Sequence, residues 1–377
     1  MADKIINIDP DEIQPEIWIR LNRIFSQGKV GSAYLFAGPE GSGKEALAIE
    51  FAKLINCEDE VKKPCNVCPS CQRINVLQHE NLTLVFPLPR GGGSSGEDDP
   101  LKGLSNKTIA VINDAIQLKS RDPFYKIRIH RANTIPISVV RELRKSAYLK
   151  TAVRGRRIIL IFDAYLLGTG EATSANALLK ILEEPPAATS FILVSDQKGS
   201  LLPTILSRCQ QIDFPPLADS VIARYITKGN VKMIAGLSLG NMRLARKLAD
   251  LETGDIPKRI EALVRLVIKQ DADNWREFVS THSRLAANEP DEYRFNFYLL
   301  QLWFRAAYRQ RMNQPDPLHE NGLLPLMEQL NHSQPSIDYL GLNHAITTAT
   351  EALARNYYIP LTLVNFLTTV RRRMSDS

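Results

Sequence analysis

One group of residues in this sequence has the types and spacing needed to hold phosphate groups. The run GPEGSGKE, residues 38–45, fits the pattern G-x-x-x-x-G-K. Such a loop directs backbone amides and the N-terminus of the following helix toward phosphates, and its lysine reaches the terminal phosphates. The pattern therefore predicts a nucleotide-binding loop that contains Gly38, Gly41, Gly43 and Lys44.

Two positions near this loop differ from those of a hydrolytic site. The residue after the lysine is usually Ser or Thr, whose hydroxyl binds magnesium, but here it is Glu45. The apolar run RIILIFDA places Asp163 where a magnesium-binding carboxylate is expected, and Ala164 follows where a water-orienting glutamate usually stands. Loss of both groups predicts little or no hydrolysis. The sequence leaves open whether ATP and Mg²⁺ bind at all. If they bind, we expect the negative charge of Glu45 to weaken their binding.

A second group consists of cysteines. Cys57, Cys65, Cys68 and Cys71 give the spacing C-x7-C-x2-C-x2-C. Four thiolates so close together suit tetrahedral zinc with no open position, so the pattern predicts a structural metal site. The alternative is four reduced cysteines without a ligand. Cys209 stands apart, and we expect it to be a small buried side chain.

The elements that must position these residues follow an alternating pattern. Short apolar runs predict buried strands, and apolar residues three and four apart predict the helices between them. The expected strands cover residues 33–37, 82–86, 156–164 and 190–195, with helices at 139–147 and at 175–184, where Pro185 ends the helix. This pattern predicts an α/β sheet over residues 30–215, with helices on both faces. Residues 87–100 read as a flexible loop within an insertion at 88–131.

From about residue 217 no comparable strand is expected. Residues 258–269, 292–310 and 344–370 carry apolar residues at helical spacing, which predicts an α-helical region. The first residues, MADKIINIDPDE, resemble no secretory signal, and no run of eighteen apolar residues occurs. We therefore expect a cytoplasmic protein with no contact to a membrane.

The composition is that of an ordinary globular protein, 44% hydrophobic and 23% charged. A net charge of +6 is compatible with contact to a nucleic-acid backbone, and equally with a mildly basic solvated surface.

Four segments together resemble the AAA+ subunits of the bacterial DNA polymerase III clamp loader. They are SAYLFAGPEGSGKEALA, the four cysteines, NALLKILEEPP (176–186) and LLPTILSRCQQIDFPPL (201–217). The resemblance implies an AAA+ P-loop NTPase-like parallel sheet in a domain of residues 1–216, which includes the zinc module 57–71. It further implies a small helical lid at 217–250 and an all-α collar at 251–377 that assembles a pentamer.

The resemblance also implies roles for single residues. Arg208, within the motif ILSRC, would act in trans as an arginine finger on ATP bound by a neighbouring subunit. Ser195 is similar to the polar sensor-1 residue, and Arg243, at the end of GNMR (240–243), is similar to the sensor-2 arginine that faces a phosphate. The chain departs from the family in its long segment 88–131, in its short lid, and in lacking the usual N-terminal signature.

Within this family, hydrolytic gamma-type subunits keep the hydroxyl and the glutamate that are absent here. Glu45 and Ala164 therefore favour a delta-prime-type subunit, with the other loader subunits, the sliding clamp and primed DNA as partners. One alternative is a competent gamma-type ATPase, which a turnover assay would distinguish. The other, a zinc-dependent nucleic-acid-binding protein, would leave the phosphate loop and ILSRC without a purpose.

Overall fold

The computed structural model describes residues 6–89, 101, 103–148, 153–168, 172–251, 255–269, 271–353 and 357–375. The chain forms two compact units. The first comprises Met1–Tyr225 and Leu239–Leu244, and the second comprises Ile226–Ser238 and Ala245–Ser377. The predicted phosphate loop, the cysteines and Arg243 all belong to the first unit.

The first unit is built on a parallel sheet. Its strands are β1 (Ala33–Ala37), β2 (Leu82–Val85), β3 (Arg157–Ile161), β4 (Thr189–Ser195) and β5 (Gln210–Asp213). They lie in the order β2-β3-β4-β1-β5, and every neighbouring pair is parallel. The pairing of Ala37 with Ser195 and with Asp213 brings three strand ends to the start of the phosphate loop. Ligands of open parallel sheets bind at this carboxyl edge.

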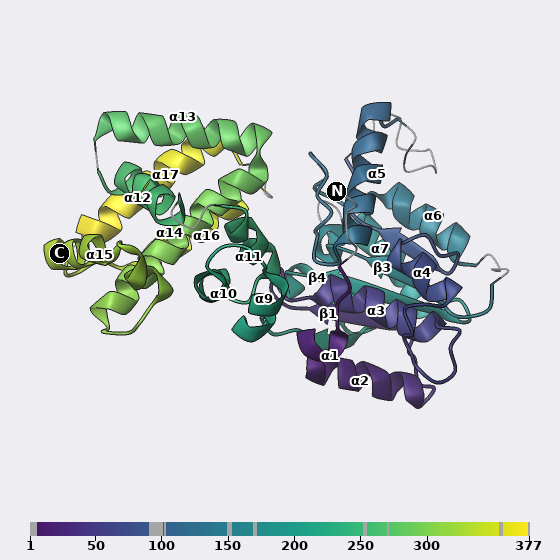
Figure 1. Cartoon of the computed structure of the whole chain (residues 1–377). Coiled ribbons are helices and arrows are strands. Elements are labelled where there is room, and N and C mark those ends of the chain that lie inside the picture. Colours follow the sequence, from purple (N-terminus) through teal and green to yellow (C-terminus); the bar gives the residue numbers. More distant parts are fainter. Residues whose placement is uncertain are drawn as a thin grey trace. The chain divides into compact units, whose positions relative to one another are not determined.

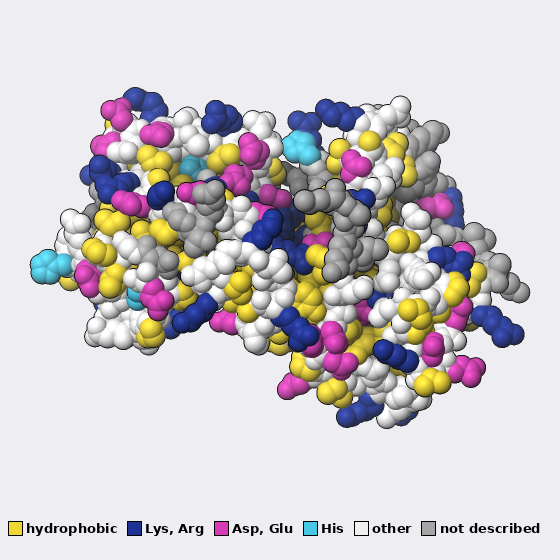
Figure 2. Space-filling view, in the orientation of Figure 1, with side chains coloured by type: hydrophobic (Ala, Val, Ile, Leu, Met, Phe, Trp, Pro, Cys, Tyr) yellow, Lys and Arg dark blue, Asp and Glu magenta, His cyan; other side chains and the backbone are white. Residues whose placement is uncertain are grey.

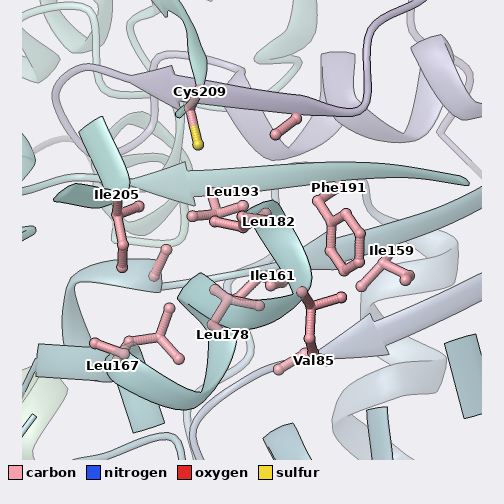
Figure 3. Packing of buried hydrophobic residues seen from close by; sticks show 14 of the residues in the cluster. Val85, Ile159, Ile161, Leu167, Leu178, Leu182, Phe191, Leu193, Ile205 and Cys209 are labelled. Atoms are coloured by element: carbon pink, nitrogen blue, oxygen red, sulfur yellow. The ribbon is translucent and has the colours of Figure 1, made fainter. Parts of the chain in front are cut away.

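Helices cover both faces of the sheet, as the continuous apolar strands predict. On one face Leu35, Ile159 and Phe191 belong to a buried cluster that also includes residues of α6 (Ile137–Ala147) and α7 (Thr173–Glu183). Figure 3 shows Leu178 and Leu182 of α7 beside the sheet residues of this cluster. On the opposite face Tyr34 contacts Phe51 of α3 (Lys44–Asn56) edge to face, with ring centroids 5.5 Å apart.

The remaining helices of this unit flank the strands (Figure 1). They are α1 (Pro10–Ile13), α2 (Pro15–Ser26), α4 (Pro69–Asn75), α5 (Asn106–Arg121), α8 (Pro203–Leu206) and α9 (Asp219–Tyr225), with short 3-10 helices η1 (Ala164–Gly168) and η2 (Lys198–Ser200). The strand expected at 156–164 ends at Ile161, because Asp163 takes a left-handed conformation with φ +50°. Strand β5 was not expected. Most of the low-complexity run 87–100 lies outside the described residues.

The second unit is helical in its described residues, as the sequence predicts. Its helices are α10 (Val231–Ser238), most of α11 (Met242–Ala249), α12 (Asp255–Ile268), α13 (Ala272–Asn288), α14 (Pro290–Arg311), α15 (Leu324–Ser333), α16 (Tyr339–Glu351) and α17 (Ile359–Ser375), with a 3-10 helix η3 (Pro317–Asn321). An aromatic core joins three of them. Phe278 of α13 packs on Phe297 of α14 and Phe366 of α17, with centroid distances of 6.1 and 5.9 Å.

The surface carries charges of both signs. On the face shown in Figure 2, Lys and Arg side chains are interspersed with Asp and Glu rather than gathered into one field. This face therefore adds no support for a dedicated nucleic-acid surface. Among the helices of the described residues, none is both long enough and apolar enough to cross a membrane.

Candidate nucleotide site and cysteine cluster

The phosphate loop connects β1 to α3 and needs glycine for two reasons. Gly41 has φ +72° and Gly43 has φ +85°, conformations that side chains other than glycine rarely adopt. A Cβ at Gly41 would also lie 2.0 Å from Oδ1 of Asn241, and one at Gly43 would lie 2.8 Å from Ile13. The loop is therefore shaped by the residues packed on it as well as by its own backbone.

Two of the predicted site residues meet where the loop begins. The backbone amide of Gly38 donates to the carbonyl of Ser195 at 3.3 Å. The hydroxyl of Ser195 accepts a bond from the amide of Gln197 at 3.2 Å. The residue expected as sensor 1 thus lies beside the phosphate loop, and its hydroxyl group is hydrogen-bonded to the backbone two residues further along the chain.

Lys44 is buried, and its side chain contacts the phosphate loop to which it belongs. Its ammonium group donates to the carbonyl of Pro39 at 2.5 Å and lies 2.8 Å from a carboxylate oxygen of Asp196. Burial alone would raise the pKa of Asp196, but the ammonium groups of Lys126 and Lys44 outweigh burial and lower it. The lysine expected to reach a phosphate therefore has an ionised carboxylate as its partner.

Glu45 also has a partner, which the sequence analysis did not anticipate. Its carboxylate forms an ion pair with Lys119, which lies near the end of α5. The same ammonium group donates to the carbonyls of Pro123 and Tyr125, at 2.8 and 2.7 Å. Burial lowers the pKa of Lys119, and the charge of Glu45 opposes that effect. The negative charge of Glu45 is thus compensated within the chain.

Asp163, the expected magnesium ligand, is buried and is contacted by a lysine. Its Oδ1 lies 2.7 Å from the ammonium group of Lys126, which also forms an ion pair with Asp196. Burial opposes the charge on Lys126, but Asp163, Asp196 and Glu40 outweigh burial and raise its pKa well above the ordinary value. Lys126 is therefore charged at neutral pH.

The expected sensor-2 segment lies directly on the phosphate loop. The amide of Met242 donates to the carbonyl of Gly41 at 3.1 Å. The guanidinium group of Arg243 binds Glu40 at 2.5 Å, and Arg128 binds the same carboxylate oxygen at 2.8 Å. Burial would raise the pKa of Glu40, but Arg128, Lys126 and Arg243 lower it far below its usual value. Arg243 therefore faces a carboxylate of the loop.

Ala164 cannot take part in chemistry at this site. It is fully buried at the first position of η1, and it belongs to the apolar cluster between the sheet and α7. The position where a glutamate would orient water is thus part of the hydrophobic core. An open pocket beside the loop is lined by Glu40, Lys44, Glu45, Lys126 and Asp196, among other residues.

The four clustered cysteines come together as their spacing predicts. Their sulfur atoms all lie within 4.8 Å of one another, and those of Cys57 and Cys68 are 4.0 Å apart. Amides of the loop donate to these sulfurs: that of Cys65 to Cys57 at 3.4 Å, and that of Cys71 to Cys68 at 3.4 Å. Four sulfurs at this spacing fit one tetrahedral ion with bonds of about 2.3 Å. The cluster can hold a metal ion with no position left for a substrate.

Arg208 lies on the surface after α8. Its guanidinium group donates to Glu183 at 2.7 Å and to the carbonyl of Thr204 at 2.9 Å. The next residue, Cys209, is buried in the cluster of Figure 3, which confirms the expectation of a small buried side chain. The structure does not bring Arg208 into the phosphate-loop cluster, whose ion pairs involve other residues.

A parallel sheet in this order, with a phosphate loop after its central strand and an acidic residue after β3, defines a P-loop protein of the AAA+ class. The chain belongs to the family described as "DNA polymerase III, delta subunit", whose match covers residues 13–218. It is accordingly an AAA+ subunit of the clamp-loader type.

Curated relatives agree with this family. The DNA polymerase III subunit tau of Bacillus subtilis is 29% identical over 266 residues, which cover 67% of this chain and 39% of that protein. The subunit delta' of the same organism is 28% identical over 232 residues, 62% of this chain and 56% of that protein. A solved gamma subunit-related protein from Thermotoga maritima has a TM-score of 0.40 and 14% identity, covering 96% of this chain and 100% of that one. The chain thus spans about two fifths to just over half the length of these curated relatives.

Five residues of the cluster were not predicted: Glu40, Lys119, Lys126, Arg128 and Asp196. The two lysines lie in the segment that was read only as an insertion, 37 to 74 positions from their carboxylate partners. Local periodicity carries no signal for such pairs. The one hint was Asp196, which directly follows Ser195 at the carboxyl end of a buried strand.

Proposed function

We propose that this chain acts as a delta-prime-type subunit of the DNA polymerase III clamp loader. In this role it helps to load the sliding clamp on primed DNA without hydrolysing ATP itself. One observation carries the proposal: Ala164 is fully buried in the core, so the side chain that would orient water is absent and its place is closed. The pairing of Glu45 with Lys119 supports the same conclusion, since the magnesium-binding hydroxyl is replaced by an internally paired carboxylate.

The partners follow from this role. We propose that the helices within 251–377 form a collar with the other loader subunits, and that 217–250 is the lid. Arg208 is proposed to act on ATP held by a neighbouring subunit, because its planar, permanently charged group suits charge that develops on phosphate oxygens. Its exposure, and its ion pair with Glu183 rather than with a residue of the chain's own phosphate loop, agree with action on another molecule. The four clustered cysteines are proposed to hold structural zinc.

The gamma-type alternative requires another acid to replace the missing glutamate. Near the loop, the described carboxylates Glu40, Glu45, Asp163 and Asp196 all have basic partners within 2.8 Å. A carboxylate held in an ion pair with a lysine is a poor base for a water molecule, because the ammonium group stabilises its charge. The structure therefore favours the delta-prime type over the gamma type.

The proposal predicts that the isolated chain hydrolyses no ATP, with or without DNA. Changing Glu45→Thr should not restore turnover, since Ala164 still provides no carboxylate. The measurement is steady-state phosphate release, with Lys44→Ala as the control that identifies contaminating ATPases. A wild-type rate of about one per second, within the usual range for enzymes, that disappears in Lys44→Ala would show that the chain is a gamma-type motor.

The role itself is tested by reconstitution. Clamp loading is measured with the full set of loader subunits, with and without this chain. We expect loading to fail when the chain is omitted. Unchanged loading without it would exclude the proposed role.

A further inference from the structure

The segment from the last turn of α5 to Arg128 brings two lysines, Lys119 and Lys126, into the place where a nucleotide and its metal would bind. Lys126 lies between the carboxylates of Asp163 and Asp196, and contacts both. Magnesium prefers carboxylate oxygens of this kind, and Asp163 is the residue that the Walker B pattern assigns to it. A fixed ammonium group therefore occupies the position between the acids that a divalent cation would need.

The second lysine closes the other half of the site. An ammonium group has three donors. Those of Lys119 have three acceptors: the carboxylate of Glu45 and the carbonyls of Pro123 and Tyr125. Glu45 stands where a hydroxyl would bind the metal, so this pair removes that ligand as well. The ammonium group of Lys119 is thus fully buried and has an acceptor for each of its donors. These partners offset the free-energy cost of burying its charge.

The phosphate loop has a third set of contacts, which two arginines make with Glu40. Arg128 and Arg243 both bind Glu40, so one carboxylate joins the lysine-bearing segment to the expected sensor-2 segment across the phosphate loop. The bond from Met242 to Gly41 adds a backbone contact. In an ordinary site these elements would be bridged by phosphates. Here they are bridged by side chains, and Lys44, Glu45, Lys126 and Asp196 line the open pocket that remains beside the loop.

We propose that Lys119 and Lys126 are an internal replacement for the magnesium–nucleotide ligand, which closes the phosphate loop to nucleotide and fixes the segments around it. A magnesium nucleotide does not fit beside these lysines. Its magnesium ion would have to displace the ammonium group of Lys126 from Asp163 and Asp196. The inference rests on the proposed function and deepens it, because it assigns residues 119–128 the task of holding the loop in one arrangement.

The experiment uses the full chain and two probes, Mg²⁺ alone and a fluorescent ATP analogue with Mg²⁺. For the wild type we expect no saturable nucleotide binding at millimolar concentration, and no change of Tm when Mg²⁺ is added to a buffer that contains neither magnesium nor a chelator. Lys126→Met keeps the length of the side chain but removes its charge, so that Asp163 loses this ion pair and Asp196 keeps only its pair with Lys44. This variant should have a lower Tm than the wild type in the same magnesium-free buffer. At about ten times Kd, Mg²⁺ should raise that Tm by roughly 3–6 °C.

Lys107→Met is the matched control, since Lys107 is an exposed residue of the same helix as Lys119. It should behave as the wild type in both assays. Saturable binding of the analogue to the wild type would overturn the inference, and so would a Lys126→Met protein that folds but gains no stability from Mg²⁺. If Lys126→Met does not fold, the wild-type titration decides alone.

The two proposals can fail separately. A wild-type chain that binds magnesium nucleotide without hydrolysing it would refute the closed loop and leave the delta-prime role intact. Normal clamp loading in the absence of this chain would refute the role, whereas the titrations would still decide whether the loop is closed.

Discussion

Replacing Arg208 with alanine is expected to lower ATP hydrolysis and clamp loading by the reconstituted loader while leaving the fold of this subunit intact. An arginine finger contributes roughly 10³–10⁵ in rate at its own site. Because a loader has several ATP sites, the loss measured for the whole complex will be smaller than this. Arg208 is exposed, and its side chain binds Glu183 and the carbonyl of Thr204, so its loss should change the free energy of unfolding by about 0–1 kcal/mol.

Two further variants sharpen this test. Arg208→Lys should remain defective, since a lysine ammonium cannot form the two parallel bonds of a guanidinium group. Arg73→Ala removes an arginine of similar exposure from an ion pair with Glu80, and it should retain full activity. The measurement compares ATPase and clamp-loading rates of complexes that differ only in this subunit. Equal rates for Arg208→Ala and wild type would reduce Arg208 to a surface residue.

Replacing Cys71 with serine is expected to remove zinc and to destabilise the first unit strongly. Cys71 is fully buried, and its sulfur is one of four that would surround the ion. A structural zinc ion contributes its binding energy directly to folding, so its loss should lower the free energy of unfolding by an amount on the order of 5 kcal/mol. Metal analysis and thermal unfolding of the purified chain measure the two effects. Treatment of the wild type with a chelator should reproduce the loss of stability.

Cys209→Ser is the matched control for this change. Cys209 is also a buried cysteine, but it lies in the apolar cluster and outside the group of four sulfurs. It should cost some stability through the buried hydroxyl, yet keep one zinc per chain. Wild-type protein that contains no zinc after purification without chelators would contradict the assignment of the metal.

Much of the fold could be predicted because its signals are local. Strands buried on both faces are continuously apolar, so β1, β3 and β4 stand out from their neighbours, and Pro185 marks the end of α7. Strand β5 was missed because its four residues, QQID, are largely polar and include only one buried side chain. It is a strand because it pairs with β1, which is a tertiary cause.

The candidate site was predictable in part for the same reason. The phosphate loop and the cysteines are short motifs whose spacing alone brings the groups together. The partners of Glu45 and Asp163 come from a segment about 40 to 75 residues away, with no motif of its own. Their pairing depends on where the chain crosses the carboxyl edge of the sheet. The negative charge of Glu45 is therefore evident from the sequence, whereas its counterion Lys119 is evident only from the structure.

The burial of Cys209 has a consequence for how the neighbouring arginine can move. The amide of Arg208 donates to the carbonyl of Ile205, and Ile205 and Cys209 on either side of it are both buried in the sheet cluster. The backbone of Arg208 can be displaced only if this part of the core opens, so its amide should exchange with solvent as slowly as those of the adjoining sheet. The freedom of this residue is thus confined to the torsions of its side chain. If Arg208 acts on a neighbouring subunit as proposed, the entropy lost on binding of its guanidinium group is that of one side chain and not that of a loop.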